Sequence, residues 1–393
     1  MSKMSFLDKL LDGVEVEWKR LGNVVRIKNG KDHKTLADGK YPVYGSGGIM
    51  RYADTYAYDK PSVLIPRKGS LGNLFFVDVP FWNVDTIFYT EIDEEQIIPK
   101  FLYYYLSTVG LGEMNQAGGV PSQTQAVLNE LKIPTPCPEN PKKSLEIQSE
   151  IVRILDAFTA MTAELTAGLS TRQKQYNYYR DKLLSFEEGE VEWKPLVEIG
   201  RIVTGRTPKS SDKSAWGDEV DFVTPSDIKC GMRTIMSPSR RLSAAGAAAM
   251  SKVQIPSGSL LVTCIGADMG KTVINANDCV PNQQINAIVL TCGSVQTGYL
   301  FHVLTAMRDI LRRQGEQGGG TMPLINKSDF SKIVVPIPAL TEQARIVAIL
   351  DKFDALTNSS TEGLPREIEL RQKQYEYYRD LLLNFPKPGE AAA

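Results

Sequence analysis

The sequence predicts an α/β (α+β) protein with two globular lobes, related by pseudo-twofold symmetry and joined by two long antiparallel coiled-coil helices. One stretch occurs twice, as RQKQYNYYRDKLL at residues 172–184 and RQKQYEYYRDLLL at residues 371–383, with eleven identical positions. Both copies lie in segments whose apolar residues recur every three or four positions, which is typical of helices. The segments between them hold short β-rich runs bounded by Gly, Pro, Asn and Asp. A close repeat at this distance indicates two similar halves.

The order of the repeated pieces predicts the domain boundaries. VEWK at residues 16–19 follows DKLL at residues 8–11, just as VEWK at residues 191–194 follows the DKLL of residues 181–184. The N-terminus therefore begins in the tail of a repeat unit. We expect an N-terminal segment completing the C-terminal repeat (1–13), a first lobe (14–145), a central helix (146–189), a second lobe (190–340), and a C-terminal helix with its tail (341–393).

The two helices are predicted to differ in length by about one turn. IVRILDAF at residues 151–158 matches IVAILDKF at residues 346–353 with an offset of 195, whereas the later motif repeats with an offset of 199. In the central helix, an extra four-residue step falls on the imperfect tandem TAELTAGL and predicts a stutter in the supercoil. In the second helix, Pro365 is expected to kink or restart the helix. The tandem comprises Thr162, Ala163, Glu164, Leu165, Thr166, Ala167, Gly168 and Leu169.

The lobes are expected to be mixed α/β structures with curved sheets and long loops. Runs such as SVLIPR, LFFVDV, SLLVTCIG and NAIVLT predict strands. Helical patterns are few and cover residues 100–108 and 297–313.

Composition limits the classes of protein. There is no run of 18 apolar residues, so no membrane span is expected. The first residues are too short and too charged for a signal peptide. Five scattered cysteines without a CxxC pair are compatible with a reducing cytoplasm, which is the expected location. With only two histidines, His33 and His302, histidine-based metal or acid–base chemistry is not expected.

No motif predicts catalysis by this chain. GADMGKT at residues 266–272 resembles a phosphate loop, but its first glycine is one position too close to the Gly-Lys pair. GxSxG and HExxH are absent, as is the Asn/Asp-Pro-Pro-aromatic motif of amino-methyltransferases. We therefore assign no catalytic and no metal-binding residues.

Polar and basic loops recur at equivalent places in the two lobes and predict a nucleic-acid interface. Net charge is −1, but residues 20–68 hold ten Lys/Arg against four Asp/Glu. Lys and Arg neutralise phosphates, and Gln, Asn, Ser and Arg read base edges. Ordinary solvated loops are the alternative interpretation. The candidates are Lys28, Lys31, Lys34, Arg51, Arg67, Lys68, Ser122, Gln123, Gln125, Arg206, Thr207, Lys209, Lys213, Lys271, Gln283, Gln284 and Thr321.

The repeated QYxYYRD motif is a candidate docking site for a partner protein. Packing in the helix seam explains Tyr176, Tyr179, Tyr375 and Tyr378. Near-identity of the two copies at positions off the seam indicates two equivalent sites for one partner, although packing alone remains an alternative. The candidate docking residues are Arg172, Gln173, Tyr178, Arg180, Arg371, Gln372, Tyr377 and Arg379.

These segments resemble the specificity subunit of type I restriction–modification enzymes, in particular the type IC (R124-like) subgroup. The resemblance covers the whole chain and includes the tandem TAELTAGL between the two helical motifs, residues 205–229 and residues 38–73. It implies that each lobe is a target-recognition domain for one half of a bipartite asymmetric DNA site. It further implies that the helices are spacers, in which the number of tetrapeptides sets the gap and to which two modification subunits bind. Two restriction subunits would complete the complex.

The same resemblance implies that this chain binds no cofactor and is not an enzyme by itself. S-adenosylmethionine, ATP and Mg would belong to the partner subunits, which methylate adenine or restrict DNA. Gly168 departs from a perfect TAELTAEL tandem and should soften the helix by about 1 kcal/mol relative to Ala. Two other hypotheses stay open: a self-contained duplicated nuclease or methyltransferase with a diverged active site, and a coiled-coil scaffold that binds no DNA.

Overall fold

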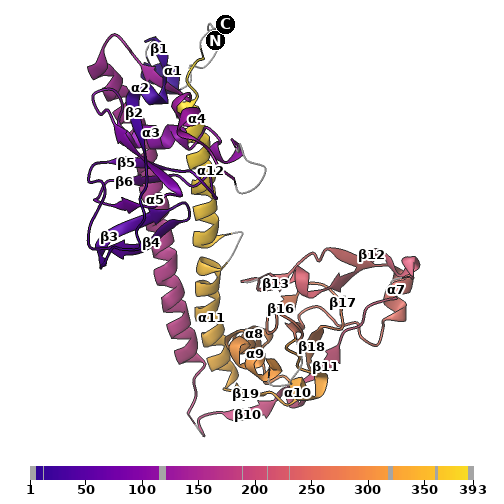
Figure 1. Cartoon of the computed structure of the whole chain (residues 1–393). Coiled ribbons are helices and arrows are strands. Elements are labelled where there is room, and N and C mark those ends of the chain that lie inside the picture. Colours follow the sequence, from indigo (N-terminus) through magenta and orange to yellow (C-terminus); the bar gives the residue numbers. More distant parts are fainter. Residues whose placement is uncertain are drawn as a thin grey trace. The chain divides into compact units, whose positions relative to one another are not determined.

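The computed structural model describes residues 6–11, 13–114, 121–187, 189–209, 211–229, 231–316, 322–358 and 362–387. The chain divides into two compact units (Figure 1). Unit 1 comprises Met1–Ala163 and Leu370–Ala393, and unit 2 comprises Glu164–Glu369. Each unit therefore combines one lobe with parts of both helical repeats.

In the described part of unit 1, the lobe holds a four-stranded sheet of order β2-β8-β5-β6, a three-stranded sheet of order β4-β3-β7, and the pair β1-β9. The elements are α1 (Phe6–Leu11), β1 (Val16–Arg20), α2 (Leu21–Val24), β2 (Val25–Asn29), β3 (Asp38–Gly45), β4 (Gly48–Ala53), β5 (Ser62–Pro66), β6 (Phe75–Val77), β7 (Trp82–Asn83), β8 (Ile87–Ile92), α3 (Pro99–Leu106), η1 (Leu111–Glu113), α4 (Gln125–Asn129), β9 (Lys132–Pro136) and α5 (Pro141–Leu183), which continues into unit 2.

The described part of unit 2 repeats this arrangement, with sheets of order β11-β18-β15-β16-β13 and β14-β12-β17 and the pair β10-β19. Its elements are β10 (Glu192–Pro195), α6 (Leu196–Ile199), β11 (Gly200–Thr204), η2 (Lys213–Ala215), β12 (Trp216–Val223), η3 (Pro225–Asp227), β13 (Thr234–Ile235), β14 (Arg240–Leu242), α7 (Ala244–Ala249), β15 (Leu260–Thr263), β16 (Thr272–Asn275), β17 (Cys279–Pro281), β18 (Ile285–Leu290), α8 (Thr297–Ala306), α9 (Arg308–Glu316), α10 (Lys327–Ser331), β19 (Val334–Ile337), α11 (Leu340–Thr357) and α12 (Gly363–Leu383), which continues into unit 1.

The central strands are buried along their whole length, which explains their continuous apolar sequences. Every residue of β5 (SVLIP) and of β15 (LLVT) is buried. Both strands pair with the equivalent neighbour, β8 in unit 1 and β18 in unit 2, in antiparallel register. The expected α+β lobes with duplicated architecture are therefore present.

Aromatic stacking joins the helices within each unit. In unit 1, the ring of Phe158 on α5 stacks on Tyr378 of α12 with a centroid distance of 5.2 Å. In unit 2, Tyr179 on α5 stacks on Phe353 of α11 at 5.7 Å. Each pair joins the phenylalanine of the IVxILDxF motif in one repeat to a tyrosine of the QYxYYRD motif in the other repeat. The start of one repeat thus packs antiparallel to the end of the other, as Figure 1 shows for α5 beside α12 and beside α11.

The C-terminal stretch forms two helices, α11 and α12, so the helix restarts close to Pro365 as the sequence predicts. Helix α11 ends at Thr357, and α12 begins at Gly363. Gly363 has a φ of 74°, and a Cβ there would lie 2.4 Å from the carbonyl oxygen of Ala355. Only glycine allows this close approach to the last turn of α11. Pro365 lies in the first turn of α12, where its missing N–H removes no helical hydrogen bond.

The helical pattern expected at residues 297–313 needs correction, and helix α7 was missed. The pattern at residues 297–313 forms two helices, α8 and α9, separated at Met307. Helix α7 was not predicted, although Ser243 provides a recognisable N-cap by accepting a hydrogen bond from the N–H of Gly246 at 3.1 Å.

The N-terminal helix packs against the end of the chain. Leu7 and Leu11 of α1 belong to the same hydrophobic cluster as Leu382 and Leu383 of α12. The indole N–H of Trp18 donates to the carbonyl oxygen of Pro386 at 2.9 Å. The chain therefore closes the tail of the C-terminal repeat onto the first lobe.

A buried glutamine near the start of each repeat helix attaches the helix to its lobe. Gln148 accepts a hydrogen bond from the N–H of Ile98 at 2.9 Å and donates to the carbonyl oxygen of Gln96 at 3.1 Å. Gln343 accepts from the N–H of Gln296 at 2.8 Å and donates to the carbonyl oxygens of Ser294 and Pro338. Ile98 and Gln296 are the N-caps of α3 and α8. Each glutamine thus satisfies backbone groups at the start of a lobe helix.

We predict that Gln343→Met lowers the free energy of unfolding by about 2 kcal/mol, because it leaves a buried N–H and two carbonyl groups without partners. Urea denaturation of the full-length chain measures this loss. Lys352→Met, at an exposed position of the same helix, is the control and should change stability little. Equal effects of the two substitutions would contradict the assignment.

Candidate nucleic-acid interface

The basic loop after the first strand starts in the same way in both lobes. Gly30 follows β2, and a Cβ there would lie 2.0 Å from the carbonyl oxygen of Val84. Gly205 follows β11, and a Cβ there would lie 2.0 Å from the carbonyl oxygen of Pro281. The next residues, Lys31 and Arg206, each donate a backbone hydrogen bond at 2.9 Å to the neighbouring strand. Both loops therefore leave the sheet at an equivalent point.

A second pair of loops is also equivalent, because each strand exit is tied to the segment after a Gly-rich stretch. In unit 1, the N–H of Gly69 donates to the carbonyl oxygen of Pro121 at 2.9 Å. In unit 2, the N–H of Gly266 donates to the carbonyl oxygen of Pro323 at 3.0 Å. Lys68 forms an isolated β-bridge with Ser122. The structure thus brings together loops that are more than 50 residues apart in each lobe.

The unit 1 candidates divide into exposed cations and residues that hold the loops. Lys31, Lys34 and Lys68 are exposed. Lys28 pairs with Glu91 at 3.6 Å, and Arg51 pairs with Asp38. Arg67 lies 5.8 Å from the centroid of the Phe88 ring.

The polar candidates of unit 1 are less accessible. Gln123 is buried, and its side-chain amide donates to the carbonyl oxygen of Pro66 at 2.6 Å. In this conformation Gln123 holds the loops together and presents no side-chain surface to a base. Ser122 and Gln125 are partly exposed.

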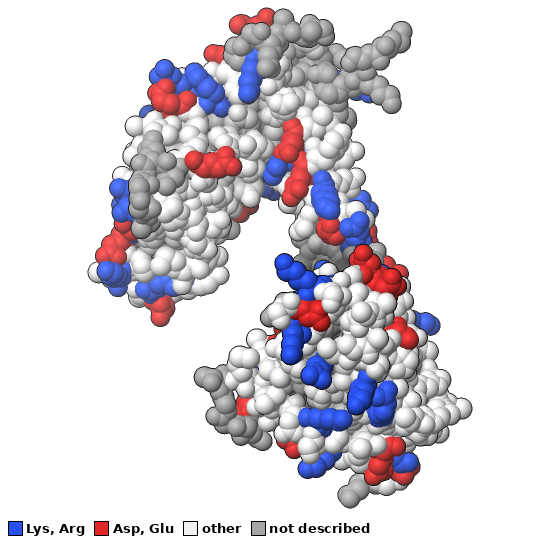
Figure 2. Space-filling view, turned by 90° about the vertical axis from the view of Figure 1, so that its right-hand side faces the viewer, with Lys and Arg blue, Asp and Glu red and all other residues white. Residues whose placement is uncertain are grey.

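Unit 2 places several candidates together. Arg206, Lys209 and Lys213 are exposed. Thr207 donates a hydrogen bond to the side chain of Gln283, which is also exposed and follows β17. Gln284 is partly buried and accepts from Asn282 at 3.1 Å. Figure 2 shows Lys and Arg side chains over the middle of the face of unit 2 in view, with Asp and Glu mostly toward its edges. Thr321 lies outside the described residues.

Lys271 lies in a different environment from these residues. Its ammonium group pairs with Asp268 at 2.7 Å and donates to the carbonyl oxygen of Ile228 at 3.1 Å. It lines a cavity of about 400 Å³ together with Gln173 and Arg180 of α5. The structure therefore groups Lys271 with candidate docking residues.

The GADMGKT segment has the wrong context for a phosphate loop. Its residues form the connection between the antiparallel strands β15 and β16, and Thr272 begins β16. A phosphate loop instead leads from a strand into a helix. Among the residues that the structure describes, no group of three or more His, Cys, Asp or Glu side chains could hold a metal ion.

The β3–β4 hairpin carries a group of exposed apolar side chains that was not predicted. Ile49, Met50 and Tyr52 are each about half exposed, at 49%, 58% and 51%. The sequence of β4, GIMRYA, shows no regular apolar–polar alternation, so it does not say which side chains the neighbouring strands cover. Apolar groups beside basic loops suit contact with thymine methyl groups.

The candidate docking residues occupy matching environments on the two helices. Tyr178 and Tyr377 are 61% and 65% exposed. Arg180 lies over the ring of Tyr176 and Arg379 over that of Tyr375, with centroid distances of 5.8 and 5.9 Å. Arg172, Gln173 and Gln372 are exposed, whereas Arg371 is partly buried and donates to Gln374 at 2.9 Å.

The seam prediction holds for only part of the tyrosines. Tyr176 is buried, but Tyr179 is 44% exposed although it stacks on Phe353. The two-helix contact covers only one face of that ring.

A protein-family model described as "Type I restriction modification DNA specificity domain" matches residues 13–172 and 188–370. The EcoR124I/EcoR124II specificity subunit of Escherichia coli is 41% identical over 99% of both chains. The EcoprrI specificity subunit of the same species is 32% identical over 92% of this chain and 93% of that one.

The chain belongs to the type I restriction–modification specificity subunit family. It is a DNA target-recognition subunit that acts with DNA and with the other subunits of such a complex. As a specificity subunit it is non-catalytic by itself, and the enzyme and scaffold hypotheses are not favoured.

The fold agrees with that of a solved family member. The S subunit of the type I restriction–modification system from M. genitalium superposes with a TM-score of 0.61 over 96% of this chain and 97% of that one, at 14% identity. No helix in the described part of this specificity subunit is both long enough and apolar enough to cross a membrane.

We predict that Arg206→Ala and Gln283→Ala affect DNA binding by the assembled complex in different ways. Arg206→Ala should remove one phosphate contact, which weakens binding to all sequences and makes the slope of log K against log salt shallower by about 0.9. Gln283→Ala should instead remove a base contact, which alters base preference within one half-site and leaves the slope nearly unchanged. Fluorescence anisotropy over a salt series measures both effects. Lys352→Ala on α11 is the control, and equal slopes for all three variants would contradict the prediction.

Proposed function

We propose that the two lobes each read one half of a bipartite asymmetric DNA site, and that the helices set the gap and dock the modification subunits. The observation that carries this proposal is the duplication of one framework with different loops. Gly30 and Gly205 begin equivalent loops, whose sequences KDHKT and RTPKS are unlike each other. Equal frameworks with unequal loops suit two readers of different half-sites.

The rest of the assembly follows from this role. We propose two modification subunits and two restriction subunits around each specificity subunit. S-adenosylmethionine, ATP and Mg then bind to those subunits, which methylate adenine or cleave DNA. This chain binds none of the three cofactors. We place the complex in the cytoplasm, and the four cysteines in the described ranges are unpaired, as a reducing compartment allows.

The tandem tetrapeptide is the proposed spacer. Thr162 to Leu169 lie within the continuous helix α5, and the boundary between the two compact units falls between Ala163 and Glu164. A Cβ added at Gly168 would meet nothing within 4 Å, so the packing of this segment does not depend on a glycine there. Four residues add about 6 Å to a helix, comparable to one or two base-pair steps of about 3.4 Å.

We predict that duplicating residues 162–165 widens the recognised gap and leaves both half-sites unchanged. The measurement is single-molecule methylation sequencing of DNA from cells that express the assembled complex, first with the wild-type chain. Gly168→Ala is the matched control, because it changes the spacer sequence without changing its length. A changed half-site with an unchanged gap would overturn the spacer role.

The docking proposal rests on the two exposed tyrosines and their surroundings. Tyr178 and Tyr377 each contact the next tyrosine edge to face, with centroid distances of 5.3 and 5.4 Å. Arg180 and Arg379 each pair with the following aspartate at 2.7 Å. Two equal surfaces with exposed aromatic rings and ordered arginines suit two copies of one partner, since aromatic and Arg residues carry much of the energy of protein interfaces.

We predict that Tyr178→Ala and Tyr377→Ala each release one modification subunit, and that the double variant binds neither. A central tyrosine at an interface contributes about 2 kcal/mol or more, which weakens each contact at least about thirtyfold. Mass photometry of the reconstituted complex counts the subunits. Lys174→Ala, an exposed position on the same helix, should leave the count at two. Full occupancy of the double variant would contradict the docking role.

A further inference from the structure

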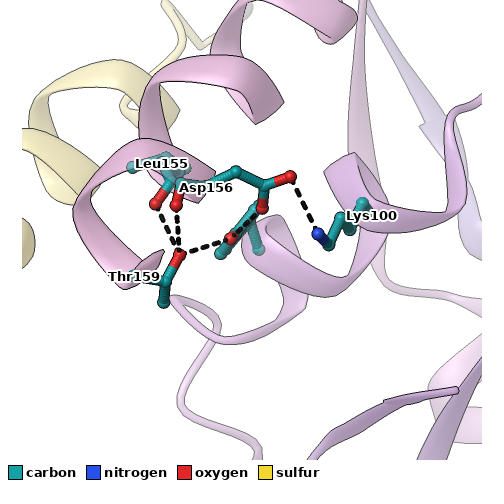
Figure 3. Close-up of polar contacts among 5 residues, drawn as sticks. Lys100, Leu155, Asp156 and Thr159 are labelled. Carbon is teal, nitrogen blue, oxygen red and sulfur yellow. Dashed lines mark hydrogen bonds and ion pairs between the residues drawn. The ribbon is translucent and has the colours of Figure 1, made fainter. Parts of the chain in front are cut away.

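A carboxylate on α5 links that helix to the lobe of unit 1. The hydroxyl of Tyr104 on α3 donates to Asp156 Oδ1 at 2.6 Å, and the ammonium group of Lys100 lies 2.8 Å from Oδ2. Figure 3 shows Asp156 reaching toward Lys100, with Thr159 on the next turn of α5. Thr159 Oγ1 lies 3.2 Å from the hydroxyl of Tyr104. Burial raises the pKa of Tyr104, so this hydroxyl keeps its proton.

Unit 2 has a carboxylate at the equivalent position of α11. Asp351 Oδ1 lies 2.6 Å from Nε2 of His302 on α8, and Arg233 donates to the same oxygen. Burial lowers the pKa of His302, so the ring is neutral at pH 7 and its Nε2–H donates to the carboxylate. The guanidinium of Arg233 also lies over the Phe301 ring, 5.3 Å from its centroid.

The two links occupy the same place but use different donors. Asp156 and Asp351 are 195 residues apart, the offset that also relates Gln148 to Gln343. Tyr104 and His302 are 198 residues apart, as are the N-caps of α3 and α8. Each aspartate thus lies about two helical turns beyond a buried glutamine, against the same lobe helix. A phenol and an ammonium group in one lobe, and an imidazole and a guanidinium in the other, each hold the aspartate of the adjacent repeat helix.

These polar links restrict rotation of the lobe helix about the repeat helix, which the apolar contacts alone would allow. Phe101 and Leu102 of α3 pack in one cluster with Ile151 and Leu155 of α5. Apolar packing is not directional, whereas hydrogen bonds weaken steeply when their angles change. On each repeat helix, the buried glutamine contacts the start of the lobe helix, and the aspartate two turns further along contacts the lobe helix at a second point. Two such points resist rotation of the lobe helix about the repeat helix.

We propose that Asp156 and Asp351 are positioning residues that fix the angle of each recognition lobe on its helix and so restrict the complex to a single gap length. This inference rests on the proposed function of the lobes and the spacer. Spacer length sets which gap fits best, and the stiffness of the two lobe–helix joints sets how sharply other gaps are rejected.

The geometry of DNA explains why a stiff lobe–helix joint would reject half-sites with the wrong gap. A gap that is one base pair too long moves a half-site by about 3.4 Å and rotates it by about 35°, since one helical turn holds about 10 to 10.5 base pairs. A lobe must then swing on its helix to reach its half-site. A stiff joint opposes the swing, and a joint without its directional hydrogen bonds permits it.

The test compares wild type, Tyr104→Phe, Asp156→Asn and His302→Phe, each as the full chain in complex with its modification subunits. Methylation sequencing of the wild type first identifies the two half-sites. A plasmid library then presents those half-sites with gaps one base pair shorter, equal and one base pair longer. We expect each variant to raise the ratio of off-gap to correct-gap methylation roughly fivefold or more, the factor that corresponds to about 1 kcal/mol. The preferred bases of both half-sites should stay the same.

A control separates positioning from general stability. Val43→Ala removes buried methyl groups from the β3–β4 sheet of unit 1, away from α3 and α5. It should lower the melting temperature without changing the gap ratio. Tyr104→Phe retains the aromatic packing and keeps the test valid if Asp156→Asn fails to assemble.

The possible results are distinct. Variants that lose stability as Val43→Ala does, with the wild-type gap ratio, would show a merely structural role and overturn the proposal. Altered bases within one half-site at an unchanged gap would overturn it as well. A wild-type complex that methylates no bipartite sequence would instead overturn the proposed function on which the inference rests.

Discussion

The exchange of helix halves between the two repeats is the constraint on which the rest of the molecule depends. Phe158 of the first repeat stacks on Tyr378 of the second, and Phe353 of the second stacks on Tyr179 of the first. Neither seam can form within one repeat, because the aromatic residues that meet belong to different copies. Each compact unit is therefore assembled from distant parts of the chain, and α5 and α12 each contribute to both units.

This constraint explains why the N-terminal segment matters. Leu7 and Leu11 pack in one cluster with Leu382, Leu383 and Phe385 at the end of the C-terminal repeat, the counterparts of Leu183, Leu184 and Phe186 at the end of the central repeat in unit 2. Helix α1 is equivalent to the tail of a repeat, so the residues that close unit 1 come from segments far apart in the sequence. Burial of apolar side chains against α12 supplies the stabilising free energy for this closure.

The lobes combine a common framework with loops that differ. Gln148 and Gln343 satisfy the same backbone groups, and Gly30 and Gly205 make the same close approach to a neighbouring strand. These positions tolerate few residue types, because a buried amide or a missing Cβ is needed there. The exposed loop residues face no such requirement, and they differ between the lobes. A protein with this division can acquire a new DNA target without changing its framework.

Much of the architecture could be predicted, because repeats and hydrophobic periodicity are local features of the sequence. The doubled motif, the two mixed lobes and the long central helix follow from residue order alone. The exact break between α11 and α12 could not be predicted. Pro365 marks the region, but the helix restarts at Gly363 because a glycine must pass close to Ala355 of the preceding helix.

The candidate site was predictable in residue type but not in arrangement. Basic loops at matching points of the two lobes indicated the interface, and Arg206, Lys209 and Lys213 are exposed there. Gln123 and Lys271 carry equally suitable side chains, yet one is buried under Pro66 and the other is paired with Asp268 beside α5. Charge and polarity do not reveal which neighbour a folded loop will meet.

By itself, the sequence determined the duplication, the family and the two lobes with their long helices, since each depends on patterns that survive in one dimension. Only the tertiary structure decided which aromatic residues meet across the predicted antiparallel seam, and that Asp156 and Asp351 meet different donors from their lobes. It also decided which loop residues stay exposed. The physical reason is that hydrogen bonds and burial depend on contacts between segments distant along the chain, and the spacing of residues does not specify those contacts.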